Sequence, residues 1–252
     1  MSIRAVIFDL DHTLYDLMDC HDKAELAIIS YVREHFAIEE EAYRTAIRQA
    51  MHATADKIGV DSAAAHSRTL RYQTFLEDCG ESVFDHADVM CRLYWDTFYR
   101  HMKREPVVVR VLEQLRERGI RIGIATDMTC DVQLEKIRIL GIGSLIDFLV
   151  TSEEAGAEKP SQRILDLCVT KAGVPKEECV FIGDHPAKDV AGPIDYGMQA
   201  VWCRHFDTDR FIRTYGIVID PAVLERIPYR FEDYGDNFKD GKLVSLGGLA
   251  LE

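Results

Sequence analysis

An apolar run that ends in two carboxylates constrains this chain more than any other feature of its sequence. Residues 5–8 are wholly apolar, as in a buried strand, and Asp9 and Asp11 follow them closely. Burial disfavours a charged carboxylate, and neighbouring like charges raise each other's pKa. Such a pair is tolerable where a divalent cation and a charged ligand share the site. We therefore expect a metal-dependent carboxylate centre at the end of the first strand.

Short apolar runs recur along the chain and predict further strands. They are rich in Val, Ile and Phe, and several are apolar at successive positions instead of alternating. Such runs are typical of a parallel sheet that is covered on both faces. The predicted strands are residues 4–10, 121–126, 148–151, 180–183, 200–204 and 217–219.

Amphipathic helical patterns lie between these runs. Residues 107–118 place their apolar side chains on one face and end at Gly119, a suitable C-cap. Residues 132–140 and 161–172 have the same pattern, and each segment is followed by a glycine. Strands that alternate with helices predict the α/β class, with a doubly wound, Rossmann-like parallel sheet as the core.

The alternation is interrupted after the first strand. Residues 17–104 contain no convincing strand, so we expect a helical cap domain inserted at this point. The catalytic core is then expected to comprise residues 1–16 and 105–220, with residues 221–252 as a C-terminal extension of unclear role. The helices predicted in the cap are residues 20–36, 39–58, 67–79 and 82–102.

The composition excludes several classes of function. A formal net charge of −13 gives little gain from counterion release, so we expect no nucleic-acid partner. Seven scattered cysteines without zinc spacing indicate reduced thiols. The first carboxylate comes too early for a signal peptide, and no apolar run is long enough to span a membrane. We expect a soluble cytoplasmic protein without a membrane partner, as a monomer or a homodimer.

Three further polar features follow predicted strands. Thr126 ends one strand, Lys159 lies before a proline at the start of a helix, and residues 183–189 read GDHPAKD after another strand. Open α/β sheets place their sites at the carboxyl ends of the strands. We therefore expect these side chains to gather near the first pair of carboxylates.

Together the four features resemble the motifs of the haloacid dehalogenase (HAD) superfamily of phosphohydrolases. The family pattern is DxDxT at residues 9–13, a strand-end threonine at Thr126, a lysine before proline at Lys159, and GDxxxxD at residues 183–189. The resemblance covers about residues 3 to 205 and includes a helical cap at the family's first insertion point. It implies a Mg²⁺-dependent phosphatase that acts on a small phosphorylated metabolite.

The resemblance implies a catalytic role for four of the residues. Asp9 would be the nucleophile that forms an aspartyl-phosphate. Asp11 would protonate the leaving oxygen and then deprotonate the attacking water, which requires a raised pKa. Thr126 and Lys159 would hold the phosphoryl oxygens.

The resemblance also implies a set of metal ligands. Mg²⁺ would be held by Asp9, the backbone carbonyl of Asp11, and Asp184, with waters completing an octahedron. Asp189 would bind or orient that shell.

Asp127 departs from the family pattern, which more often has asparagine or another neutral residue after the motif threonine. We place Asp127 in the substrate-binding set with Asp9, Thr126 and Lys159. An additional carboxylate there would repel a phosphate unless it points away or meets a cation.

Asp11 distinguishes phosphatase activity from dehalogenase activity within the superfamily. Dehalogenase members of the superfamily lack an acid at this position, because a halide leaving group needs no proton. A phosphomutase would use the same four motifs and remains an alternative, as does a non-catalytic binding or regulatory module on this fold. We expect substrate choice to reside in the cap.

Overall fold

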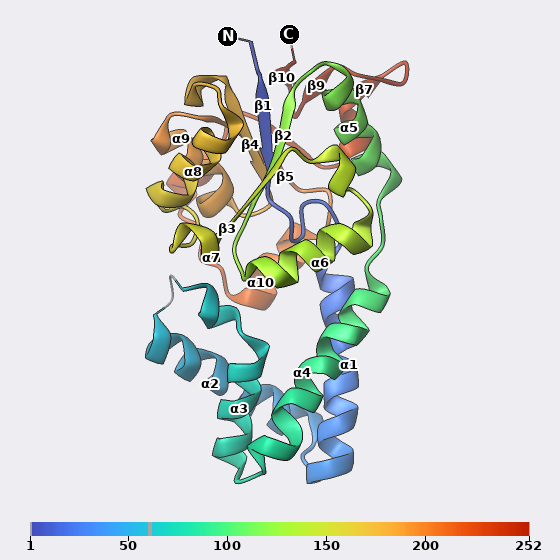
Figure 1. The fold of residues 1–252 in the computed structure, drawn as a ribbon, viewed down its shortest axis with the longest axis vertical. Coiled ribbons are helices and arrows are strands. Elements are labelled where there is room, and N and C mark those ends of the chain that lie inside the picture. The colour runs from blue at the N-terminus through green and yellow to red at the C-terminus, as the bar shows by residue number, and fades with distance from the viewer. Residues whose placement is uncertain (1, 60–61, 252) are drawn as a thin grey trace. The chain divides into compact units, whose positions relative to one another are not determined.

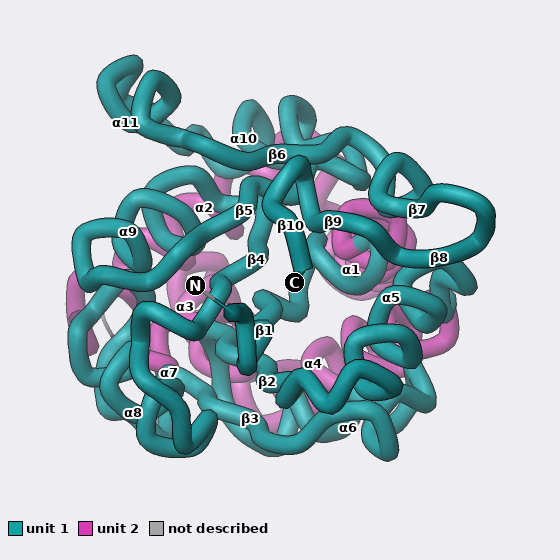
Figure 2. Tube along the Cα trace, turned by 90° about the horizontal axis from the view of Figure 1, so that it is seen from above, with its two compact units in different colours: residues 1–16, 103–252 teal, residues 17–102 magenta. Residues whose placement is uncertain are grey.

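The computed structural model describes residues 2–59 and 62–251, and the chain forms two compact units (Figures 1 and 2). One unit comprises residues 1–16 and 103–252, and the other comprises residues 17–102. Each unit is described separately below.

The first unit is built on a six-stranded parallel sheet with the strand order β3-β2-β1-β4-β5-β6. β1 is central, and its two neighbours come from distant parts of the sequence, as in a doubly wound fold. The prediction of an α/β fold with a parallel sheet is confirmed. The strands are β1 (Ala5–Phe8), β2 (Arg121–Thr126), β3 (Phe148–Thr151), β4 (Cys179–Gly183), β5 (Gln199–Cys203) and β6 (Arg230–Phe231).

Helices cover both faces of this sheet (Figure 1). α8 and α9 lie on one side of the strands, and α5 and α6 lie on the other. β1 and β4 are buried along their whole length, as their continuous apolar sequences predict. The helices of this unit are α5 (Pro106–Glu117), α6 (Cys130–Leu140), α7 (Ser152–Ala155), α8 (Gln162–Ala172), α9 (Gly192–Tyr196), α10 (Thr208–Tyr215) and α11 (Pro221–Glu225).

The register of the central strands brings their carboxyl ends together. Phe8 of β1 lies opposite Ile124 of β2 and Ile182 of β4. The residues that follow these three positions therefore emerge at one edge of the sheet. The backbone N–H of Asp9 continues the ladder by donating to the carbonyl of Ile182 at 2.8 Å.

The strand predicted at residues 217–219 is wrong. Val218 in this segment is 93% exposed, and the segment has no strand partner. Residues of the C-terminal extension take the edge position instead, because the N–H groups of Trp202 and Arg204 donate to the carbonyls of Tyr229 and Phe231. A run of only three apolar residues is too short to distinguish a strand from a loop that connects two helices.

The rest of the C-terminal extension packs on the same unit. Tyr234 is fully buried and donates its hydroxyl to the carbonyl of Thr13 at 3.2 Å. Leu243 and Leu246 are also fully buried. Gln114 of α5 is bonded to the backbone N–H of Leu243 at 2.6 Å. The extension ends in two short hairpins, formed by β7 (Phe238–Lys239) with β8 (Lys242–Leu243) and by β9 (Ser245–Leu246) with β10 (Leu249–Ala250).

The second unit is helical in its described residues, and the four helices predicted for it are confirmed. Ser67 and Ser82 cap two of them by accepting backbone N–H groups of the first turn. Aromatic side chains fill its interior, and Tyr43 packs edge-on against Phe75 with their centroids 5.4 Å apart. The helices are α1 (Leu17–Phe36), α2 (Glu40–Ile58), α3 (Arg68–Cys79) and α4 (Val83–His101). Among the described residues, no helix has the length and apolar character needed to cross a membrane.

Candidate active site

Three buried aspartates meet at the carboxyl edge of the sheet. Asp9 follows β1, Asp184 follows β4, and Asp189 lies in the helical turn after β4 (residues 186–191). Each offers a carboxylate oxygen, and these atoms all lie within 4.8 Å of one another. The side chains of three of the four predicted metal-site residues therefore lie close together.

The turn after β4 holds Asp189 in place. The N–H of Asp189 donates to the carbonyl of His185 at 2.8 Å, and the N–H of His185 donates to Oδ2 of Asp189 at 3.0 Å. A Cβ atom at Gly183 would overlap the Asp189 carboxylate. Glycine at this position therefore allows the carboxylate to approach the end of β4.

Lys159 joins two of these aspartates. Its Nζ lies 2.5 Å from Oδ1 of Asp9 and 2.7 Å from Oδ1 of Asp189, and the residue is 5% exposed. Thr13 donates to Oδ2 of Asp9 at 3.2 Å, so both oxygens of that carboxylate are oriented. Charge-assisted bonds of this kind fix a side chain more firmly than neutral ones.

The carboxylate cluster carries more negative charge than Lys159 neutralises. Burial raises the pKa of Asp9 to about 7, the repulsion of Asp189 and Asp11 adds to that, and Lys159 opposes it. Burial and the repulsion of Asp9 and Asp189 raise the pKa of Asp184 well above its usual value. Carboxylates whose ionised forms are disfavoured in this way are stabilised by a bound cation.

The donor set fits a hard divalent cation. Oδ2 of Asp184 is buried and has no hydrogen-bond partner. Carboxylate oxygens are the protein ligands that Mg²⁺ prefers. Asp9, Asp184 and Asp189 are therefore able to hold such an ion, and the orphaned oxygen of Asp184 is the atom whose bonding it would complete.

Asp11 lies beside this cluster in a separate network. Nζ of Lys136 is 2.7 Å from Oδ1 and 2.9 Å from Oδ2 of Asp11. Gln133 donates to Oδ2 at 3.0 Å, and the hydroxyl of Tyr15 donates to Oδ1. Burial alone would raise the pKa of Asp11, but the Lys136 ammonium and these hydrogen bonds lower it below its usual value. The expectation of a raised pKa for Asp11 is therefore wrong, because a buried lysine faces the carboxylate.

Thr126 is buried at the end of β2, as predicted. Nε2 of Gln133 lies 2.5 Å from its Oγ1, and the same nitrogen donates to the carbonyl of Asp127 at 2.9 Å. Gln133 thus connects Thr126 to Asp11 and fixes the relative positions of the two loops.

The Asp127 carboxylate meets a cation and a backbone donor. Nζ of Lys188 lies 2.8 Å from its Oδ2, and the N–H of Lys159 donates to its Oδ1 at 2.9 Å. Burial raises the pKa of Asp127, but Lys159 and Lys188 together lower it below its usual value. Lys188 also lies 3.0 Å from Oε2 of Glu158.

Sequence reasoning missed three residues that hold this site together, namely Gln133, Lys136 and Lys188. The first two lie three residues apart on α6, directly after the motif threonine, so they share one face of that helix. Lys136 is 1% exposed, next to the buried Ile137. A lysine within the buried stripe of a helix was the available signal.

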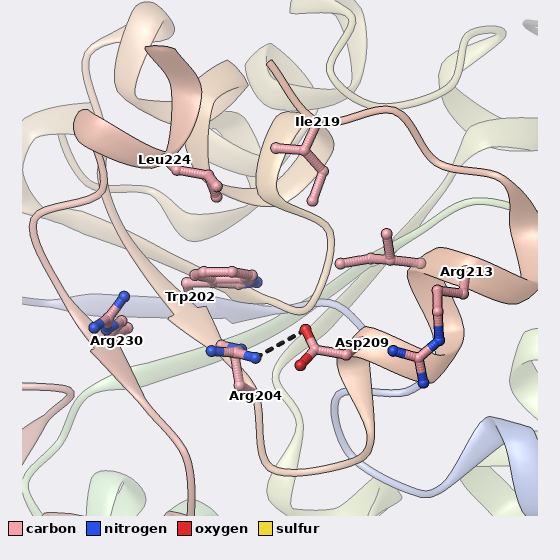
Figure 3. A pocket seen from close by; sticks show the side chains of 8 residues that line it. Trp202, Arg204, Asp209, Arg213, Ile219, Leu224 and Arg230 are labelled. Carbon is pink, nitrogen blue, oxygen red and sulfur yellow. Dashed lines mark hydrogen bonds and ion pairs between the residues drawn. The ribbon is translucent and has the colours of Figure 1, made fainter. Parts of the chain in front are cut away.

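A separate pocket of about 400 Å³ lies between β5, α10 and α11 (Figure 3). Its wall includes the face of Trp202, whose indole N–H donates to the carbonyl of Asp184 at 2.8 Å. Arg204, another lining residue, is already paired with Asp209 at 2.9 Å and with Glu232 at 3.2 Å. Trp202 therefore helps to hold the backbone of Asp184, and the lining of the pocket includes none of the clustered carboxylates.

The chain belongs to the haloacid dehalogenase-like hydrolases, whose family model matches residues 3–197. Two of its curated relatives are phosphatases. It is 30% identical over 199 residues to the ribulose-1,5-bisphosphate 5-phosphatase of Halopiger xanaduensis, covering 78% of this chain and 83% of the relative. It is 32% identical over 219 residues to the glyceraldehyde 3-phosphate phosphatase of Methanopyrus kandleri, covering 80% and 84%. The chain is accordingly a hydrolase of phosphate monoesters in the phosphatase branch of the family.

Solved structures share the same fold. A HAD phosphatase from Thermococcus onnurineus superposes with a TM-score of 0.67 at 20% identity, covering 96% of this chain and 100% of that one. A 2-haloacid dehalogenase from Pseudomonas syringae superposes with a TM-score of 0.70 at 23% identity, covering 93% and 96%. Because the same fold carries both chemistries, the activity is decided by side chains.

Proposed function

We propose that this chain is a Mg²⁺-dependent phosphatase that hydrolyses a small phosphorylated metabolite through an aspartyl-phosphate on Asp9. The observation that carries the proposal is the position of Lys159, bonded to both Asp9 and Asp189 beside the orphaned carboxylate oxygen of Asp184. This arrangement offers a nucleophile, a phosphate-binding cation and a metal site within a few bond lengths.

In the first half-reaction a carboxylate oxygen of Asp9 attacks phosphorus. The bond from phosphorus to the ester oxygen breaks, and the leaving oxygen receives a proton from Asp11. Lys159 and Thr126 bind the phosphoryl oxygens and offset their charge. Asp9, Asp184, Asp189 and the carbonyl of Asp11 would hold Mg²⁺, which supplies further neutralisation of the phosphoryl charge when bound.

In the second half-reaction water attacks the phosphorus of the aspartyl-phosphate. Asp11 takes the proton of that water, and the bond between phosphorus and Asp9 breaks, which regenerates the carboxylate and releases inorganic phosphate. Because Lys136 favours the ionised form of Asp11, Asp11 is suited to the role of base in the resting protein. Its role as acid requires that it first gain a proton, which the solvent or a singly protonated phosphate monoester supplies.

Asp11 also favours phosphate transfer over dehalogenation, since a carbon–halogen bond breaks without protonation of the leaving group. Both named relatives act on phosphorylated carbohydrates, which supports a small phosphorylated metabolite as the substrate here. We propose that residues 17–104 act as the cap that selects it, and that residues 1–16 and 105–220 form the catalytic core.

The proposal is tested by the steady-state hydrolysis of p-nitrophenyl phosphate with Mg²⁺, with EDTA, and with the Asp9→Asn variant. We expect turnover that requires the metal and is lost in the variant. Folded wild-type protein that binds Mg²⁺ but turns over only a hexose phosphate, by transfer instead of hydrolysis, would indicate a mutase. Folded protein that processes no phosphate ester would contradict the proposal.

A further inference from the structure

The residue after the motif threonine is a carboxylate, and it adjoins two residues that are expected to bind the phosphate. Asp127 directly follows Thr126, and its Oδ1 accepts the N–H of Lys159 at 2.9 Å. Two of the residues proposed to hold the phosphoryl group are thus linked to one side chain. An unpaired carboxylate at this position would oppose the binding of a phosphate.

Lys188 supplies the missing charge from another loop. It lies in the turn after β4, one residue before Asp189, and its Nζ is 2.8 Å from Oδ2 of Asp127. The Asp127 side chain is 15% exposed and that of Lys188 is 31% exposed, so solvent screens the pair only in part. One ion pair therefore ties the loop after β2 to the loop after β4.

We propose that Asp127 and Lys188 are a matched pair of positioning residues for phosphate binding. Asp127 places Lys159 by accepting its backbone N–H. Lys188, which also pairs with Glu158 at 3.0 Å, offsets the charge of Asp127 so that the phosphate is repelled less. The two roles can be tested separately, because an asparagine side chain can accept the same hydrogen bond but carries no charge. This inference rests on the proposed phosphatase function.

The charge-cancelling role is tested with Lys188→Met, Asp127→Asn and the double variant. We expect Lys188→Met to raise both the KM of p-nitrophenyl phosphate and the Ki of inorganic phosphate, on the order of tenfold, because it leaves the Asp127 carboxylate without its cation beside the phosphate-binding residues. Asp127→Asn in the Lys188→Met background should restore both constants to within about threefold of the wild type. A double variant as impaired as Lys188→Met would overturn the charge-cancelling role.

The hydrogen-bonding role is tested with Asp127→Leu. Asp127→Asn retains an acceptor for the N–H of Lys159 and should keep most of kcat, whereas Asp127→Leu should lower kcat about tenfold or more. Equal kcat values for Asn and Leu at position 127 would overturn this part. A merely structural role would lower the amount of folded enzyme in both variants, which active-site titration with vanadate would reveal.

Lys171 provides a matched control within the same unit. Its side chain is 29% exposed and pairs with Glu154 at 2.6 Å, so it resembles Lys188 in exposure and pairing but contacts none of the carboxylate cluster. Lys171→Met should leave KM and the Ki of phosphate unchanged. If Lys171→Met shifts both constants as much as Lys188→Met, the inference fails. A wild-type enzyme without activity would instead contradict the proposed function, so the two failures are distinguishable.

Discussion

Nζ of Lys136 lies within 2.9 Å of both carboxylate oxygens of Asp11, although the two residues are 125 positions apart in the sequence. The lysine is 1% exposed, so its ammonium is buried against the one carboxylate that the proposed reaction uses as acid and base. This pairing orients Asp11 and sets the charge that it carries before a substrate arrives.

Removing Lys136 should impair the action of Asp11 as a base. In Lys136→Met the Asp11 carboxylate loses the buried partner that orients it and favours its ionised form, so we expect hydrolysis of the aspartyl-phosphate to slow and kcat to fall by a factor of about 10 to 100. The loss should be similar for an alkyl phosphate and for p-nitrophenyl phosphate, because both substrates form the same aspartyl-phosphate. Arg138→Met on the same helix is the control, since Arg138 pairs with Glu135 of its own helix. Equal activities of the two variants would contradict this role.

Metal-free protein should lose stability as the pH rises. The pKa of Asp9 is near 3.8 when unfolded and about 7 when folded, so between these values the folded state holds a proton that the unfolded state has released. The free energy of unfolding in EDTA should therefore decrease from about pH 4 to about pH 7, by a few kcal/mol. Asp9→Asn removes this contribution, and its profile from urea unfolding should be flatter over that window. Parallel profiles of the two proteins would contradict the assignment.

Mg²⁺ should stabilise the folded protein through Asp184. At pH 8, a Mg²⁺ concentration 100 times Kd should add about 2.7 kcal/mol to the free energy of unfolding. Asp184→Asn should lose most of this gain, because Asp184 supplies the orphaned oxygen. Asp88→Asn, which alters an exposed pair of the helical unit, should keep it. Thermal unfolding with and without Mg²⁺ measures the difference, and an undiminished gain in Asp184→Asn would exclude that residue as a ligand.

The C-terminal extension should contribute to the stability of the first unit. Tyr234 is fully buried, and its hydroxyl donates to the backbone carbonyl of Thr13. The side-chain hydroxyl of Thr13 in turn donates to Asp9 and orients it. We expect Tyr234→Phe to cost about 1 kcal/mol and Tyr234→Ala about 3–5 kcal/mol. Tyr215→Phe, at a position 41% exposed, should cost less than about 0.5 kcal/mol. Chemical denaturation gives these values, and a Tyr234→Ala variant as stable as the wild type would contradict the stabilising role of Tyr234.

Much of the fold could be predicted because periodicity and strand ends are local properties of the sequence. The continuous apolar runs before Asp9 and Asp184 indicated buried parallel strands, and those strands place the two carboxylates at one edge. The edge strand β6 could not be predicted, because two residues become a strand only by pairing with β5. Residues 217–219 had the stronger local pattern but no partner.

The polar network of the site was beyond the reach of local patterns. The sequence showed that Asp127 departs from the family pattern, but its partner Lys188 lies 61 positions later in the chain. Lys136 is similarly remote from Asp11, and a single lysine carries no motif. Pairings of this kind are created by the meeting of loops at the sheet edge, and only the three-dimensional structure assigns them.

The proposed role of Asp9 as the nucleophile is tested most directly by chemical trapping of the aspartyl-phosphate. Enzyme turning over substrate with Mg²⁺ is quenched in acid, reduced with borohydride and digested, and its peptides are examined by mass spectrometry. The Asp11→Asn variant is treated in parallel, because it should retain the intermediate for longer. We predict that position 9 is converted to homoserine in a substrate-dependent manner and to a greater extent in Asp11→Asn. Phosphorylation of any other residue, or an unmodified Asp9 in both proteins while substrate is being cleaved, would contradict the role of Asp9 as the nucleophile.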